Sequence, residues 1–181
     1  AELKVRNYFY SVEFGKRKLT AAINKLKKEH ADLWQEEMMG YTDDYLDFIR
    51  STALASPTEP YVAIEKKVDL TAYIPDGFGT ADCILICGDT IHVIDFKYGK
   101  NPNGRVSAEH NPQMQLYALG AYEAYRMLYM VKRVRMSIVQ PRLPEGITTW
   151  ETTLEELLAF GQVVKEKAAL AIEGKGEYAP S

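Results

Sequence analysis

The sequence predicts a mixed α/β protein in which a central sheet is flanked by helices. Three observations support this class. Helical apolar spacing dominates residues 1–57, short β-rich segments follow between residues 61 and 97, and helical and β-rich segments then alternate. With 46% apolar and 26% charged residues over 181 positions, the composition excludes disorder and allows a full core. We expect one domain, and a sequence that opens in the middle of a helix suggests a fragment of a longer chain.

The N-terminal part, residues 1–57, is expected to be helical. Apolar residues at helical spacing predict a helix over residues 18–39 that ends at Gly40, because glycine is a common helix stop. Thr42 is then expected to cap a second helix, which should end before Pro57.

Charge and hydropathy restrict the partners of the chain. A net charge of -3 argues against nucleic-acid binding through bulk positive charge, although a local basic groove remains compatible with it. One basic run is either a solvated helix face or a patch that steers phosphates. It consists of Lys16, Arg17, Lys18, Lys25, Lys27 and Lys28. The longest apolar run, residues 83–87, is far below the ~20 residues of a membrane span, so we expect no membrane and a cytoplasmic location.

Residues 61–140 are expected to form the core, followed by a C-terminal helix. The expected elements are strands over residues 61–68, 80–87, 90–97 and 134–140, and helices over residues 111–129 and 152–173. Asn111 before Pro112 is typical of a helix N-cap with proline at the first helical position. Thr152 or Thr153 is expected to cap the last helix.

Two carboxylates are expected to meet near the end of a hairpin. Gly88 and Asp89 form a two-residue connection, and counting back from this turn pairs Asp82 with Asp95. Opposed side chains have Cβ atoms roughly 4.5 to 5.5 Å apart, and Lys97 lies two residues beyond Asp95 on the same face. Apolar residues occupy both faces of this hairpin, so we expect it to be covered on both sides.

Such a pair requires compensation. At about 5 Å and an effective dielectric near 20, the repulsion is on the order of 3 kcal/mol. A shared proton, Lys97 as counter-ion, or a divalent cation would each provide it, and Mg²⁺ or Mn²⁺ suits an oxygen-rich site with open positions. The alternative is a salt-bridged strand end, and a one-residue bulge would break the pairing. With a metal, two carboxylates and a lysine suit phosphodiester cleavage, since the metal binds phosphate and acidifies water while the lysine stabilises developing charge.

Three motifs in order carry a family resemblance. They are Gly79-Thr80-Ala81-Asp82, Val93-Ile94-Asp95-Phe96-Lys97 and Gln113-x-x-x-Tyr117. Together they resemble the PD-(D/E)XK nuclease superfamily, in particular its RecB-like exonuclease branch, and the stretch 74–122 is similar to a phage-associated family of exonucleases. The resemblance implies a restriction-endonuclease-like α-β-β-β-α-β core.

The resemblance also implies roles for individual residues. Asp82 and Asp95 match metal-binding acids, the backbone carbonyl of Phe96 matches a further metal ligand, and Lys97 matches the catalytic lysine. Gln113 and Tyr117 match a pair on a helix near the site, and their i, i+4 spacing places both on one helix face. A glutamate near Glu65 supports the metal in some relatives. Lys100 and Arg105, in the loop after Lys97, are candidates for contacts with the DNA backbone.

Two features depart from the family pattern. The branch carries a histidine on a helix before the strands, whereas His30 lacks that context and is expected on the surface. His92 is expected in the core or at an edge, and His110 in a loop. Many relatives hold an iron-sulfur cluster, which Cys83 and Cys87 do not support; we expect them to be small core residues.

The sequence therefore predicts a metal-dependent nuclease, in particular a phage or mobile-element DNA exonuclease of recombination or repair. DNA and recombination proteins are the expected partners. The rival is a nuclease-fold protein that binds DNA or a recombination partner without cleavage. Asp82, Asp95 and Lys97 favour the enzyme, and the missing histidine favours the rival.

Overall fold

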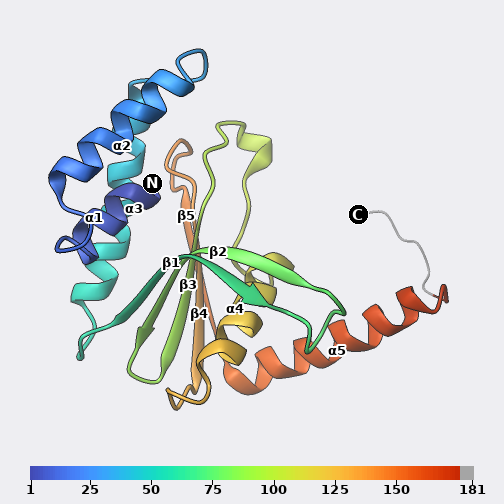
Figure 1. Cartoon of the computed structure of the whole chain (residues 1–181). Coiled ribbons are helices and arrows are strands. Elements are labelled where there is room, and N and C mark those ends of the chain that lie inside the picture. The colour runs from blue at the N-terminus through green and yellow to red at the C-terminus, as the bar shows by residue number, and fades with distance from the viewer. Residues whose placement is uncertain (176–181) are drawn as a thin grey trace.

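A five-stranded mixed sheet with helices on both faces forms the centre of the molecule (Figure 1), which confirms the expected α/β class. The structure is a computed structural model that describes residues 1–175. The strand order is β1-β2-β3-β4-β5, and β3 and β4 pair in parallel while the other neighbours are antiparallel. The strands are β1 (Tyr61–Asp69), β2 (Phe78–Cys87), β3 (Thr90–Phe96), β4 (Arg133–Val139) and β5 (Ile147–Thr153).

The helices divide between the two faces of the sheet. They are α1 (Glu2–Phe9), α2 (Lys16–Glu29), α3 (Glu37–Leu54), α4 (Pro112–Tyr125) and α5 (Leu154–Ile172), with a 3₁₀ turn, η1 (Pro102–Gly104). Figure 1 shows the α1–α3 layer on one side and α4 with α5 on the other. α4 supplies the crossover that the parallel β3–β4 pair requires.

Alternation along the β2–β3 hairpin builds two cores. Ile84, Ile86, Ile91 and Val93 are buried in the α4–α5 core. Their neighbours in the chain, such as Leu85, are buried in the core under α1 and α3. The expected cover on both faces is therefore confirmed.

The hairpin register is the predicted one. Cys87 pairs with Thr90, and the ladder continues in step to Cys83 opposite Ile94. Gly88 has φ 61°, in the left-handed region that glycine enters at little cost, so the tight connection follows from local sequence.

Two helix starts also agree with the sequence. The Asn111 side chain accepts a hydrogen bond from the Met114 N–H at 3.1 Å, with proline at the first helical position of α4. Thr153 caps α5, and Glu156 completes a capping box by accepting from the Thr153 N–H. These caps satisfy backbone donors that a helix start leaves unpaired.

The N-terminal helix boundaries were predicted wrongly. The expected helix over residues 18–39 is two helices, because α2 ends at Glu29 and α3 starts at Glu37. Gly40 and Thr42 lie inside α3, so neither is a helix end. The Thr42 hydroxyl donates to the carbonyls of Met38 and Met39, a contact that satisfies it within the helix.

Strand β5 was missed in the sequence. It is an edge strand paired antiparallel with β4, from Val139 opposite Ile147 to Arg133 opposite Thr153. Its side chains are mostly exposed or half-buried, so the apolar alternation that marks an inner strand is weak. The β-branched run Ile147-Thr148-Thr149 is the signal that could have found it.

β1 and β2 bend together midway along their length. Their ladder runs from Tyr61 opposite Ile86 to Asp69 opposite Phe78, and skips only the position where Glu65 faces Asp82. Glu65 has φ 50°, which ordinary residues rarely adopt. Figure 1 shows both strands turning away from β3 in the middle of the sheet, so the sheet opens into a fork there.

Candidate active site

Asp82 lies in the fork between β2 and β3. The β2–β3 ladder stops at Cys83 opposite Ile94, one pair before Asp82 would face Asp95. At that point the Asp82 carboxylate accepts a hydrogen bond from the Phe96 N–H at 2.8 Å. The Asp82 side chain therefore satisfies the Phe96 N–H, a backbone donor of β3 that lies past the last residue pair of the β2–β3 ladder. The sequence assumed a regular hairpin to this point and did not predict the fork.

Asp95 is the buried carboxylate of the site, with 5% of its surface exposed. Its Oδ2 lies 3.0 Å from the Lys97 ammonium, and the Lys97 side chain keeps 27% of its surface exposed. Apart from this ion pair, Asp95 Oδ2 has no hydrogen-bond partner among residues 1–175. The Lys97 ammonium is therefore the counter-charge that the structure places against this buried carboxylate.

Lys97 connects the carboxylates to α4. Its ammonium donates to Gln113 Oε1 at 3.2 Å, and Gln113 Nε2 donates to the Tyr117 hydroxyl at 2.9 Å. One row of polar contacts thus leads from Asp95 through Lys97 and Gln113 to Tyr117. The structure brings together the residues that all three sequence motifs supply.

Gly79 has a role that the sequence did not reveal. A Cβ atom at this position would lie 2.5 Å from Cε1 of the Tyr117 ring, closer than such atoms approach. The ring therefore packs directly on the β2 backbone, three residues before Asp82. Only glycine allows this approach, and it ties the first and third motifs together.

Burial is the main electrostatic influence on Asp82. Loss of solvent raises the pKa of its carboxyl group, and the negative charge of Asp95 raises it further. The hydrogen bond from Phe96 and the Lys97 charge oppose this shift of the pKa. The two carboxylates therefore lie near enough to repel each other. The neutral form of Asp82 is favoured more strongly than the neutral form of an exposed aspartate.

Glu65 stands beside this pair rather than within a ligand set. Burial raises the pKa of its carboxyl group, and the Asp82 charge adds to the shift, which places the two near one another. Within residues 1–175, no three His, Cys, Asp or Glu side chains gather at metal-binding distance. Glu65 faces Asp82 across the β1–β2 ladder, so its support of a metal stays a prediction.

The donor set fits a magnesium-type cation. Asp82, Asp95 and the Phe96 carbonyl would supply oxygen ligands, and the two neighbouring carboxylates with one ammonium beside them are the observation that favours a cation there. Mg²⁺ usually keeps several waters and needs only one or two carboxylates when substrate phosphates complete its shell. A site with two acidic side chains is therefore sufficient for it.

The two basic loop candidates differ in their surroundings. Lys100 is exposed after β3. The Arg105 guanidinium donates to the carbonyls of Glu145 and Pro144, which ties its loop to the β4–β5 turn. The Gln140 side chain holds the same loop, accepting from the Val106 N–H at 2.8 Å. Arg105 thus has a structural contact that the sequence did not indicate.

The histidines lie apart from the carboxylates. His30 is exposed after α2, and the His110 ring packs at a tilt against Trp150, with 4.4 Å between ring centroids. His92 is buried, hydrogen-bonds to Ser137 through Nε2 at 2.8 Å, and burial lowers its pKa to about 3. Cys83 lies in the core, where burial raises the pKa of its thiol, whereas Cys87 is only partly buried.

Replacing Asp82 by asparagine should stabilise the chain at neutral pH in EDTA. The raised pKa of Asp82 means that the folded state disfavours the charged form. Below pH ~3.9 the Asp82 carboxyl is protonated in both the folded and the unfolded state. As the pH rises through the folded pKa, the free-energy cost of the charged carboxylate in the folded state grows, and it persists above that pKa. We expect the Tm at pH 7 to rise by up to about 4 °C and the gain to shrink toward pH 4.

The control for this measurement is Asp44→Asn, which changes an exposed aspartate of α3. It should leave the Tm unchanged at both pH values. A lower Tm for Asp82→Asn at pH 7 would show that the charged carboxylate, and not its amide analogue, is needed to hold the Phe96 N–H.

The fold and the site define a class: a mixed α/β protein with two carboxylates and a lysine at a fork in its sheet. The chain belongs to the family described as "Protein of unknown function (DUF2800)", whose profile matches residues 1–181. Among solved structures it is similar to the one titled "Crystal structure of SSO0001", with a TM-score of 0.39 and 14% identity, covering 84% of this chain and 70% of that chain. A similarity at this TM-score carries no argument. Within residues 1–175, no helix combines the length and apolar character that crossing a membrane requires.

Proposed function

We propose that this chain is a metal-dependent nuclease of the PD-(D/E)XK type that hydrolyses phosphodiester bonds. The observation that supports it most is the row of contacts at the fork, in which Asp82 and Asp95 lie beside Lys97 and the Lys97 ammonium reaches Gln113. The best fit is a DNA exonuclease of a phage or mobile element that acts in recombination or repair.

Each group has a task in this proposal. Asp82, Asp95 and the Phe96 carbonyl would hold Mg²⁺ or Mn²⁺. When bound, the cation supplies charge neutralisation of the phosphate and acidification of a water. Lys97 sets a positive charge beside Asp95, where it orients the nucleophile or stabilises the negative charge that develops on the phosphate.

Gln113 and Tyr117 act as positioning residues. The Gln113 carbonyl oxygen accepts from Lys97 and its amide donates to Tyr117, so the lysine ammonium is held at a fixed place over the fork. Tyr117 is in turn fixed by its packing on Gly79. Holding the ammonium before substrate arrives avoids reorganisation during the reaction.

One observation favours the rival, a protein that binds DNA or a recombination partner without cutting. None of the three histidines, all within the described residues, lies with the pair of carboxylates, whereas the family that the motifs resemble carries one before the strands. A weaker metal site would then serve binding alone. The two functions differ in a single measurable property, cleavage that requires a divalent cation.

The test is incubation of the chain with end-labelled linear DNA and with covalently closed circular DNA. Mg²⁺, Mn²⁺ and EDTA are compared in parallel. An exonuclease degrades the linear DNA in Mg²⁺ or Mn²⁺, leaves the circle intact and is inactive in EDTA. If the chain binds linear DNA but does not degrade it under any of the three conditions, the rival function is established and the nuclease is rejected.

The loop after β3 yields a second prediction about DNA. Replacing Lys100 and Arg105 together by alanine should weaken DNA binding, and the slope of log affinity against log salt should fall by about one for each phosphate that these side chains pair with. Because Arg105 also holds backbone carbonyls of residues 144 and 145, the two single variants are measured as well. An unchanged slope in the double variant would identify both as solvated or structural charges.

A further inference from the structure

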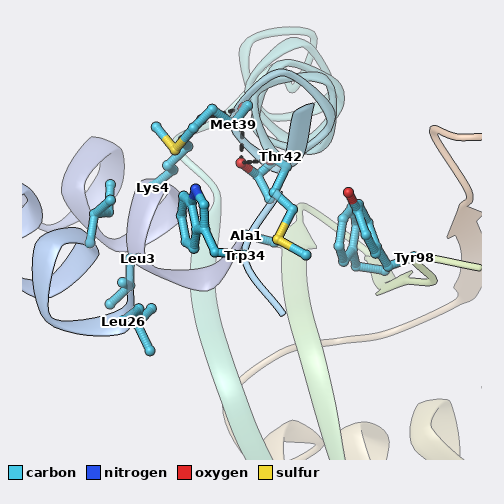
Figure 2. Close-up of a pocket in the computed structure, with 11 residues that line it drawn as sticks. Ala1, Leu3, Lys4, Leu26, Trp34, Met39, Thr42 and Tyr98 are labelled. Carbon is cyan, nitrogen blue, oxygen red and sulfur yellow. Dashed lines mark hydrogen bonds between the residues drawn. The ribbon is translucent and has the colours of Figure 1, made fainter. Parts of the chain in front are cut away.

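An apolar cavity of about 190 Å³ lies between the helical layer and the end of β3 (Figure 2). Its lining consists of Ala1, Leu3, Lys4, Ile23, Leu26, Trp34, Met38, Met39, Thr42, Phe96 and Tyr98. Two aromatic rings from distant parts of the chain, those of Trp34 and Tyr98, contribute to its wall, and Figure 2 shows methionine and leucine side chains around them. It is smaller than a drug-sized ligand pocket, which usually spans about 300 Å³ or more.

The cavity adjoins the candidate active site through Phe96. The Phe96 backbone N–H is hydrogen-bonded to Asp82, and the same residue lines the cavity. Tyr98 follows Lys97 directly in the chain. Because side chains alternate across a strand, Phe96 belongs to the core under α1 and α3, whereas Asp95, like Val93, faces the α4 side. The cavity and the carboxylates therefore lie on opposite faces of the sheet near the end of β3.

The polar features of the cavity indicate what it accepts. The Tyr98 hydroxyl is enclosed and has no hydrogen-bond partner within the described part of the chain. The groups that act on this hydroxyl are Arg142, Glu37 and Tyr41, none of which lines the cavity, so Tyr98 offers its ring to the cavity. One side of the Tyr98 ring is already covered, since the Arg142 guanidinium lies 4.6 Å from the ring centroid. The preferred ligand is therefore apolar in body.

The surrounding charge favours a polyanion. α2 carries six basic side chains and one acidic side chain, a local charge of +5 on a chain whose net charge is -3. This same helix contributes Ile23 and Leu26 to the cavity wall. Lys27 Nζ lies 4.9 Å from the centroid of the Trp34 ring and 3.1 Å from Glu36 Oε1, so the charge of this one lysine is already paired. An apolar aromatic-lined cavity beside a basic helix is the arrangement that binds single-stranded nucleic acid, with bases stacked and phosphates paired to cations.

We propose that the cavity binds an unpaired nucleobase of a DNA strand whose phosphates follow α2 toward Asp82 and Asp95. The inference rests on the proposed function, in that it takes DNA as the ligand of the site. It assigns the basic run of α2 to phosphate contacts and the rings of Trp34 and Tyr98 to contacts with the base. It also makes a strand with an unpaired end the preferred substrate.

The first experiment uses Trp34 as a reporter. The chain has two tryptophans, so Trp150→Phe leaves Trp34 as the only one without altering the cavity. This protein is titrated in EDTA with single-stranded oligodeoxythymidylate and with an abasic oligonucleotide of the same length. We expect quenching of Trp34 fluorescence and about 10-fold tighter binding for the strand that carries bases. Equal affinity and equal quenching for the two strands would overturn the proposal.

The second experiment removes the ring. Trp34→Ala should reduce affinity for oligodeoxythymidylate about 10-fold and leave affinity for the abasic strand unchanged. Tyr8→Ala is the matched control, because Tyr8 is an exposed aromatic residue of the same helical layer that lies outside the cavity. A preference for bases that persists in Trp34→Ala would reject the site. If that variant does not fold, the Trp34 fluorescence in Trp150→Phe decides the matter.

Failure of this inference is distinguishable from failure of the proposed function. Binding is measured without a divalent cation, so it does not depend on cleavage. Base-dependent binding without any cleavage would reject the nuclease and support this inference. Cleavage of DNA together with equal binding of base-bearing and abasic strands would support the nuclease and reject this inference.

Discussion

Replacing Asp95 by asparagine is expected to abolish cation-dependent cleavage, with a loss of more than about 100-fold. Changes to groups that merely orient metal ligands cost about 10- to 100-fold, and Asp95 is placed as a ligand itself. Its Oδ2 is buried and, apart from the Lys97 ammonium, uncompensated. An amide is neutral and offers one oxygen in place of two, so it neither balances a divalent cation nor holds Lys97 as an ion pair.

The same variant should have little effect on stability in EDTA. It removes the repulsion between Asp95 and Asp82 but also the 3.0 Å ion pair with Lys97. Lys97 keeps 27% of its surface exposed and can turn to water, so the two effects oppose each other within about 1 kcal/mol. We therefore expect the Tm in EDTA to change by less than about 4 °C, or to rise.

The control is Asp44→Asn, which should retain both cleavage and Tm. Lost cleavage with an unchanged or raised Tm supports a functional metal site. A clear drop in Tm for Asp95→Asn, together with a wild-type chain that does not cleave, would instead identify Asp95 and Lys97 as a structural pair and support the binding-only function.

Replacing Gly146 by alanine is expected to be strongly destabilising. A Cβ atom there would lie 1.9 Å from the carbonyl oxygen of Gln140 and 2.8 Å from that of Leu143. The turn cannot open without cost, because the Gly146 carbonyl accepts the Gln140 N–H at 2.6 Å. Both clashing atoms belong to the backbone, so we expect a loss of about 3 kcal/mol, or roughly 6 to 12 °C in Tm.

Gly40→Ala provides a matched control with the opposite sign. Gly40 lies within α3, and a Cβ atom there would meet no heavy atom within 4 Å. Alanine in a helix is more stable than glycine by about 1 kcal/mol, so the Tm should rise. Thermal unfolding of both variants beside the wild type decides the prediction, and a Tm for Gly146→Ala equal to that of the wild type would contradict it.

The Gly146 turn also bears on the candidate site. Gln140 precedes the turn, and its side chain accepts from Val106 and donates to the Gly104 carbonyl at 3.0 Å. The turn therefore holds the loop between β3 and α4, in which Lys100 and Arg105 lie. A chain weakened at Gly146 should lose order in that loop before it unfolds completely, since loop contacts are among the least stable parts of a fold.

Local signals in the sequence were sufficient for several elements. The two-residue turn at Gly88 and Asp89 determines the hairpin register, since a pleated ladder advances one pair at a time on each side of a turn. Asn111 and Thr153 mark helix starts because their side chains bond backbone donors three residues away. These interactions lie within a few residues, so propensity and spacing predict them.

Elements with weaker local signals were predicted less well. Apolar spacing continues through Leu33 and Trp34, so the break between α2 and α3 is not visible in the periodicity. β5 pairs with β4 along one edge only, and its exposed side chains leave no inner-strand pattern. In both cases packing against other elements, rather than the segment's own residues, decides the outcome.

The α/β class, the β2–β3 register, the caps of α4 and α5 and the residue types of a candidate site all follow from the sequence alone. How those residues meet depends on the tertiary structure. The fork at Asp82, the packing of Tyr117 on Gly79 and the cavity between Trp34 and Tyr98 each join segments far apart in the chain. Such contacts depend on how strands bend and helices dock, and no periodicity within one segment encodes them.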